Sequence, residues 1–136
     1  MRKPNIAILG ATGVVGREIT KIVDELGVEF NEIKFLSSAK SAGKKIDFKG
    51  KTYTVEEAKP ESFDGVNIVM ASAGGATSQK FAPEIVKRGG VLIDNSSAFF
   101  NRQVFFCANS SLFILRILFH RFHMNTHMSI LSKFFF

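Results

Sequence analysis

The feature that most constrains the fold is a glycine-rich segment, residues 10–16 with the sequence GATGVVG, that separates two apolar patterns. Residues 6–9, just before it, are all apolar, as in a parallel strand that is buried on both faces. After it, apolar side chains recur at helical spacing and stop at Gly27; they are Val15, Ile19, Ile22, Val23 and Leu26. This order predicts a strand, a tight turn and an amphipathic helix, the opening unit of an α/β domain.

The same alternation continues to about residue 93. We predict further strands at residues 33–36, 66–71 and 91–93, and a helix whose apolar face includes Phe81 and Ile85 and which ends at Gly89-Gly90. Between the second and third strands, residues 46–48 and 53–55 alternate about Lys49-Gly50-Lys51, which favours a small hairpin. The fold class that follows is α/β, a Rossmann-like, doubly wound and mostly parallel sheet that is incomplete and lacks an intact catalytic domain.

The glycine-rich segment has the features of a phosphate-binding turn. A ligand phosphate placed there would meet free backbone N–H groups and the positive end of the helix dipole. Gly10 allows the tight turn, Gly13 the close approach of a diphosphate, and Gly16 close packing of helix on strand. The spacing departs from the commonest dinucleotide fingerprint, with two residues instead of one between the first glycines. The alternative is a purely structural turn.

The end of the second strand indicates which dinucleotide binds. An NAD site usually places an acidic residue about 20 positions after the glycines, where it binds the ribose 2′-hydroxyl. Here the segment 36–43 has no acid and instead contains Ser37, Ser38, Lys40 and Ser41, which suit a 2′-phosphate. We therefore predict NADP as the cofactor. The alternative is a solvated loop in which the lysine has no ligand.

Two further polar turns fall at the same edge of the predicted sheet. Ser72, Ala73 and Gly74 follow the strand at 66–71 and precede a helix, where open α/β folds bind ligands. Asn95 follows the last strand. We predict that both turns face the cofactor, while a flexible connection and a backbone cap are the alternatives.

Taken together, residues 10–16, 35–43, 72–75 and 94–99 resemble the N-terminal domain of the aspartate-semialdehyde dehydrogenases. The resemblance covers roughly residues 4–99. The stretches SSAKSAG and DNSSAF are more selective than the glycine turn, and they disfavour the related N-acetyl-glutamyl-phosphate reductases.

The resemblance implies an NADPH-dependent reductive dephosphorylation of aspartyl phosphate to aspartate semialdehyde, a step that leads to lysine, methionine and threonine. It implies that Thr12, Gly13, Val14 and Val15 bind the diphosphate. Lys40 and Ser41 match positions that hold the adenosine 2′-phosphate. The family is homo-oligomeric and acts on a small-molecule substrate.

A change of composition near residue 99 separates two predicted segments, a dinucleotide-binding domain at 1–99 and an unrelated apolar and basic tail at 100–136. All twelve acidic residues lie at or before Asp94, whereas four basic residues follow it, Arg102, Arg116, Arg121 and Lys133. The abrupt change is typical of a shifted reading frame or an aberrant gene-model end, with disorder as another interpretation.

The tail does not supply the family's catalytic machinery. Phe100 stands where the family typically has a phosphate-binding arginine. Cys107, the one cysteine, lies among phenylalanines, which disfavours an activated thiolate. His120, His123 and His127 would share a helix face, but no carboxylate accompanies them, so we predict neither a catalytic residue nor a metal site.

These patterns predict an NADP-binding domain of a cytoplasmic enzyme, with no turnover by this chain alone. The single cysteine excludes an internal disulfide, and residues 1–5 show no apolar signal segment. Although the net charge is +6, basic and aromatic residues are not interleaved in the domain, which disfavours a nucleic-acid partner. The alternative is a non-catalytic dinucleotide-binding fragment whose tail binds a partner or a membrane surface. The membrane is the less favoured of the two, because the apolar stretch of the tail is short and is interrupted by a charged residue.

Overall fold

The computed structural model of the 136-residue chain describes residues 2–94. The predictions made for Asn95 and for the tail at 100–136 lie outside the described residues. Within residues 2–94, no helix is long and apolar enough to cross a bilayer.

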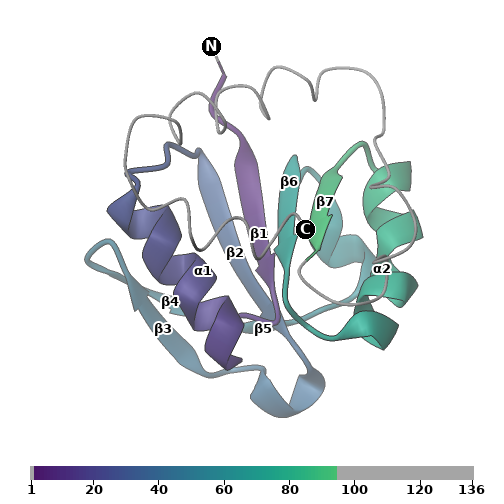
Figure 1. The fold of residues 1–136 in the computed structure, drawn as a ribbon, viewed down its shortest axis with the longest axis horizontal. Helices are drawn as coiled ribbons and strands as arrows, with labels where there is room; N and C mark the ends of the chain where they lie inside the picture. Colours follow the sequence, from purple (N-terminus) through teal and green to yellow (C-terminus); the bar gives the residue numbers. More distant parts are fainter. Residues whose placement is uncertain (1, 95–136) are drawn as a thin grey trace, which may run out of the picture. The chain divides into compact units, whose positions relative to one another are not determined.

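Five parallel strands form the central sheet, in the order β5-β2-β1-β6-β7 (Figure 1). Their bounds are β1 Asn5–Leu9, β2 Glu32–Ser37, β5 Glu56–Glu57, β6 Ile68–Ala71 and β7 Val91–Asp94. The first strand lies in the middle, two later strands extend the sheet on one side, and two still later strands extend it on the other. This is the order of a doubly wound, Rossmann-like sheet, so the predicted fold class is confirmed.

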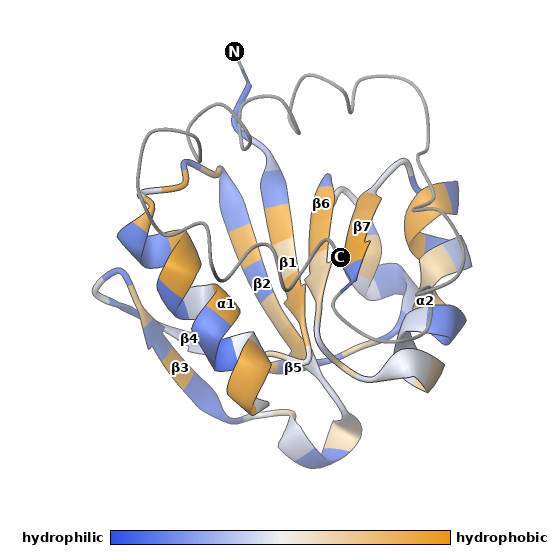
Figure 2. Cartoon of the chain, in the orientation of Figure 1, coloured by the Kyte–Doolittle hydropathy of each residue, from blue (hydrophilic) through white to orange (hydrophobic). Residues whose placement is uncertain are grey.

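Two helices cover opposite faces of the sheet. Helix α1 (Val14–Glu25) and the hairpin of β3 (Lys45–Phe48) and β4 (Lys51–Thr54) enclose one apolar cluster, which contains Ile8, Phe35 and Phe48. Helix α2 (Gly75–Lys87) and the short helix η2 (Pro60–Phe63) enclose the other, with Leu9, Phe63 and Phe81. In Figure 2 the strands β1, β6 and β7 are largely apolar, as expected of strands with both faces covered.

The sequence-based boundaries agree closely with these elements. The hairpin forms about Lys49-Gly50, where Lys49 has φ 50° and Gly50 φ 73°, a left-handed turn that joins β3 to β4. The strand predicted at 66–71 is shorter at its start, because residues 66 and 67 complete the preceding turn, with the Val66 amide donating to the Phe63 carbonyl at 3.1 Å. The short helix η1 (Ala39–Ser41), η2 and the two-residue strand β5 were not predicted.

A polar cluster holds the end of α2 on the loop before β6. Arg88 donates from Nε to Asp64 Oδ1 at 2.7 Å and from Nη1 to a Glu84 carboxylate oxygen. The hydrogen bond that Arg88 donates to Glu84, followed by the one it donates to Asp64, raises the pKa of the Arg88 guanidinium above its ordinary value. This cluster lies at the opposite end of α2 from Gly75, and we assign it a structural role.

Candidate functional site

The direction in which successive strands are added to the sheet reverses between β1 and β6, and the candidate site lies at that point. Strand β1 pairs with β2 on one side and with β6 on the other, and all three run in the same direction. Helices α1 and α2 both begin at the carboxyl ends of these strands (Figure 1). In open α/β sheets the crevice at this edge is where ligands bind.

The glycine-rich turn that follows β1 is held by backbone hydrogen bonds. Gly10 has φ 84°, a left-handed conformation that favours glycine. The amides of Gly10 and Ala11 both donate to the Leu36 carbonyl, at 2.8 and 3.1 Å, and the Gly13 amide donates to the Gly10 carbonyl at 3.1 Å. The turn is therefore fixed to the end of β2 before any ligand arrives.

Gly10 and Gly16 are required by packing within the protein. A Cβ on Gly16 would lie 2.1 Å from the Gly10 carbonyl oxygen and 2.9 Å from the Ala11 Cα. A Cβ on Gly10 would lie 2.5 Å from the Ser72 carbonyl oxygen, in the loop that follows β6. Gly10 thus allows the tight turn, as predicted. Gly16 allows close packing, but against the turn at the end of β1 and not along the strand.

Gly13 differs, because neither its backbone conformation nor its neighbours among residues 2–94 require a glycine. Its φ of −73° and ψ of 168° are open to any residue. A Cβ there would meet only the Gly10 carbonyl oxygen, at 3.4 Å, which is an ordinary contact distance. Apart from that contact, the space that a Cβ on Gly13 would enter is open among residues 2–94.

The first turn of α1 presents backbone donors that have no backbone partner among residues 2–94. The first intrahelical hydrogen bond runs from the Arg17 amide to the Gly13 carbonyl at 3.0 Å, so the amides of Val14, Val15 and Gly16 precede it. No side chain caps this end of the helix and no acidic residue lies in its first turn. Val14 is 82% exposed. The helix dipole and these amides can accept an anion.

The end of β2 adjoins the glycine-rich turn. The Ser37 hydroxyl is buried and lies 3.0 Å from the Thr12 hydroxyl. Ser38 follows as the N-cap of η1, and the Ser41 amide donates to its carbonyl at 2.9 Å. Ser38 and Lys40 are exposed and Ser41 is half-buried, so three of these polar side chains remain accessible to a ligand.

The loop after β6 forms the other side of the crevice. The Ser72 amide donates to the Leu9 carbonyl at 2.8 Å, which joins this loop to the end of β1. Gly74, the N-cap of α2, has φ 86° and ψ 155°, a conformation that only glycine adopts readily. At the end of β7, the buried Ser78 hydroxyl of α2 donates to Asp94 Oδ1 at 2.9 Å. The glycine-rich turn and the loop after β6 therefore approach each other at Gly10 and at Ser72 and Ala73.

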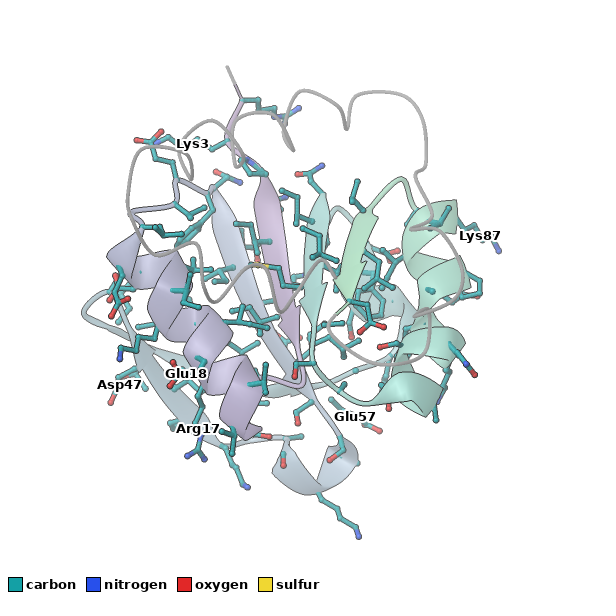
Figure 3. The ribbon with its side chains drawn as sticks, viewed as in Figure 1. Lys3, Arg17, Glu18, Asp47, Glu57 and Lys87 are labelled. Atoms are coloured by element: carbon teal, nitrogen blue, oxygen red, sulfur yellow. The ribbon has the colours of Figure 1, made fainter. Side chains whose placement is uncertain are left out.

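The structure thus brings together every predicted binding residue that it describes, from three loops at one edge of the sheet. It also places a residue there that sequence patterns missed: Glu57, on β5, pairs with Ser37. Figure 3 shows Glu57 at the end of the sheet where α1 and α2 begin, with Lys3 and Lys87 at the opposite end. No group of three or more potential metal ligands occurs among residues 2–94.

Comparisons with known proteins place this geometry in a family. A family model described as "Semialdehyde dehydrogenase, NAD binding domain" matches residues 5–111. The aspartate-semialdehyde dehydrogenase of Bacillus subtilis is 53% identical over 95 residues, which are 70% of this chain and 28% of that protein. The corresponding protein of Synechocystis is 45% identical over 94 residues, 69% of this chain and 28% of that protein. The chain spans less than a third of the length of these relatives.

Solved structures agree with the sequence comparisons. Aspartate semialdehyde dehydrogenase II of Vibrio cholerae, solved as a complex with ASA, matches with a TM-score of 0.71 at 37% identity, over 75% of this chain and 33% of that one. The enzyme of Candida albicans, solved with NADP, matches with a TM-score of 0.63 over 74% of this chain and 31% of that one. At 21% identity the Candida structure shows the shared fold alone.

Proposed function

We propose, from the premise that this chain belongs to the semialdehyde dehydrogenase family and carries the NAD-binding domain of an aspartate-semialdehyde dehydrogenase, that it binds NADP at the crevice between β1 and β6. The diphosphate would lie on the amides of Val14, Val15 and Gly16, with Thr12 beside it. We place the boundary of the nucleotide-binding domain near residue 99.

The observation that carries this proposal is the room at Gly13. A glycine in an ordinary extended conformation lowers stability without need, because it adds conformational freedom to the unfolded chain. Here neither φ nor packing against residues 2–94 requires it, since a Cβ would make a 3.4 Å contact, and the preference for glycine over alanine at a helix N-cap is the structural reason that remains. A diphosphate seated on the α1 amides would occupy the space that a Cβ enters. The residues present therefore fit the family's cofactor.

The adenosine end of the cofactor would lie over β2 and η1. Segment 36–44 contains no carboxylate, while Ser38, Lys40 and Ser41 offer two hydroxyls and an ammonium. A doubly charged 2′-phosphate gains from such donors, whereas the bare 2′-hydroxyl of NAD gains little. The preference for NADP over NAD follows from this difference, and Ser37 contributes by holding Thr12 in place.

On the other side of the crevice, Ser72, Ala73 and Gly74 would lie against the cofactor, with Asn95 following β7. The small side chains at 72–74 leave the backbone of this loop accessible to a flat ligand group. The half-buried state of Ser72 and Ala73 is consistent with that role.

We propose that the whole enzyme carries out the reaction that the resemblance implies, NADPH-dependent reduction of an acyl phosphate to an aldehyde, for which the bound cofactor would supply the hydride. Residues 2–94 contain no cysteine and no histidine, so the described part of this chain has no thiol nucleophile or imidazole base. We propose that the chain binds the cofactor without turning over substrate on its own.

Two assays on the whole chain test these proposals. In isothermal titration calorimetry, we expect NADP to bind with a lower Kd than NAD. Equal or tighter binding of NAD would refute the cofactor assignment, and no binding of either would refute the site. In a spectrophotometric assay with aspartate semialdehyde, inorganic phosphate and NADP, we expect no formation of NADPH. Turnover that is lost on Cys107→Ser substitution would overturn the proposed inactivity.

A further inference from the structure

A carboxylate reaches the candidate adenosine site from the strand next to β2. Strand β5 is only two residues long, and it pairs in parallel with the last two residues of β2, Leu36 opposite Glu56 and Ser37 opposite Glu57. Strand β2 ends without an acid, but an acid stands directly beside its last residue.

The side chain of Glu57 lies on the same face of the sheet as the Ser37 hydroxyl, which is the face that α1 covers. Ile33 and Phe35 of β2 belong to the cluster under α1, and Ser37 continues that alternation toward Thr12. Val55 belongs to the same cluster, so Glu57, two residues later, points to that face as well. Paired strands are about 4.8 Å apart, which puts the carboxylate close to a ribose held over Ser37 and η1.

Lys59 partly neutralises this carboxylate. Its Nζ lies 3.2 Å from Glu57 Oε2, and the two side chains are 60% and 43% exposed. The Ser62 hydroxyl accepts from the Lys59 amide at 3.1 Å and donates to the Glu57 carbonyl at 3.2 Å, which holds the intervening turn. The ion pair is thus built on an ordered backbone.

We propose that Glu57 is a specificity-determining residue and that Lys59 sets the strength of its effect. The carboxylate accepts hydrogen bonds from the adenosine ribose of NAD and repels the 2′-phosphate of NADP, while pairing with Lys59 weakens both effects. The pair therefore tunes the ratio of the two affinities. This inference rests on the proposed nucleotide-binding function.

The test is calorimetric titration of NADP and NAD into the whole chain and three variants. For Glu57→Gln we expect the ratio of the Kd of NAD to that of NADP to rise about two- to fivefold, the range expected for an exposed charge pair. For Lys59→Met we expect it to fall by a similar factor. Glu56→Gln is the matched control, because Glu56 lies on the same strand opposite Leu36 and faces the other way.

High salt gives a second criterion, since both shifts should shrink at about 0.5 M NaCl. An unchanged ratio in Glu57→Gln, or an equal shift in Glu56→Gln, would overturn this inference while leaving nucleotide binding intact. Failure of the unmodified chain to bind either nucleotide would overturn both the inference and the proposed function.

Discussion

Gly10 and Ser72 meet at the point where the strand order reverses, so closely that a Cβ on Gly10 would lie 2.5 Å from the Ser72 carbonyl oxygen. The contact joins the turn after β1 to the loop after β6. It fixes how closely the two loops approach each other, through backbone atoms.

Replacement of Gly10 by Ala should therefore be severe. The substitution combines a left-handed φ of 84° with a backbone clash, and we expect a loss of about 2–4 kcal/mol in the free energy of unfolding. Urea denaturation followed by circular dichroism measures it. A loss below about 0.5 kcal/mol would show that the two loops move apart easily.

Gly13→Ala and Gly16→Ala make a matched pair in the same turn. Gly16→Ala should cost about 2 kcal/mol or more, because its Cβ would lie 2.1 Å from a carbonyl oxygen. Gly13→Ala should change stability by less than about 1 kcal/mol, since its backbone suits alanine but alanine is a poorer N-cap than glycine. It should nonetheless weaken NADP binding by about tenfold or more.

The combination of unchanged stability and lost affinity in Gly13→Ala is the informative result. Urea denaturation and calorimetry on the same preparation give both quantities. If Gly13→Ala binds NADP as the unmodified chain does, the diphosphate does not lie at the start of α1.

The Thr12–Ser37 hydrogen bond should couple the glycine-rich turn to the end of β2. We expect a double-mutant cycle of Thr12→Val and Ser37→Ala to give a coupling of about 1 kcal/mol in unfolding free energy. Chemical denaturation of the four proteins measures it. Additive effects would mean that the bond does not hold the turn.

Lys40→Met should weaken binding of NADP by about five- to tenfold and leave that of NAD within about twofold, because only NADP has a phosphate for the ammonium. Lys51→Met is the control, since Lys51 is also exposed but lies opposite Phe48 beside the hairpin turn. Calorimetry at low salt is the measurement. Equal loss for both nucleotides would indicate that Lys40 contacts the diphosphate, and no loss for either would mean that Lys40 does not contact the cofactor.

Much of this fold was predictable because its elements have strong, uninterrupted patterns. The apolar run at residues 6–9 and the helical stripe from Val15 to Leu26 each specify one structure, and β1 and α1 follow them closely. The structural roles of Gly10 and Gly16 were predictable for a similar reason, because the turn between a buried strand and a packed helix leaves no room for a Cβ at these positions.

Strand β5 and its acidic residue could not be found in this way. Two consecutive glutamates have neither the alternation nor the β-branched side chains that indicate a strand. They form one because the Ala58 amide donates to the Ser37 carbonyl at 2.8 Å and Val55 is buried beneath the hairpin, which are contacts between distant segments. Helix η1 is similar, since its sequence alone is equally typical of a solvated loop.

An NMR titration of the uniformly ¹⁵N-labelled chain with NADP tests the central claim most directly. We expect the largest amide shifts at Val14, Val15 and Gly16, with a second group at residues 38–41 that is weaker when NAD replaces NADP. Amide shifts that are absent from residues 12–16, or that are confined to other parts of the chain, would contradict the assignment of this turn as the diphosphate site.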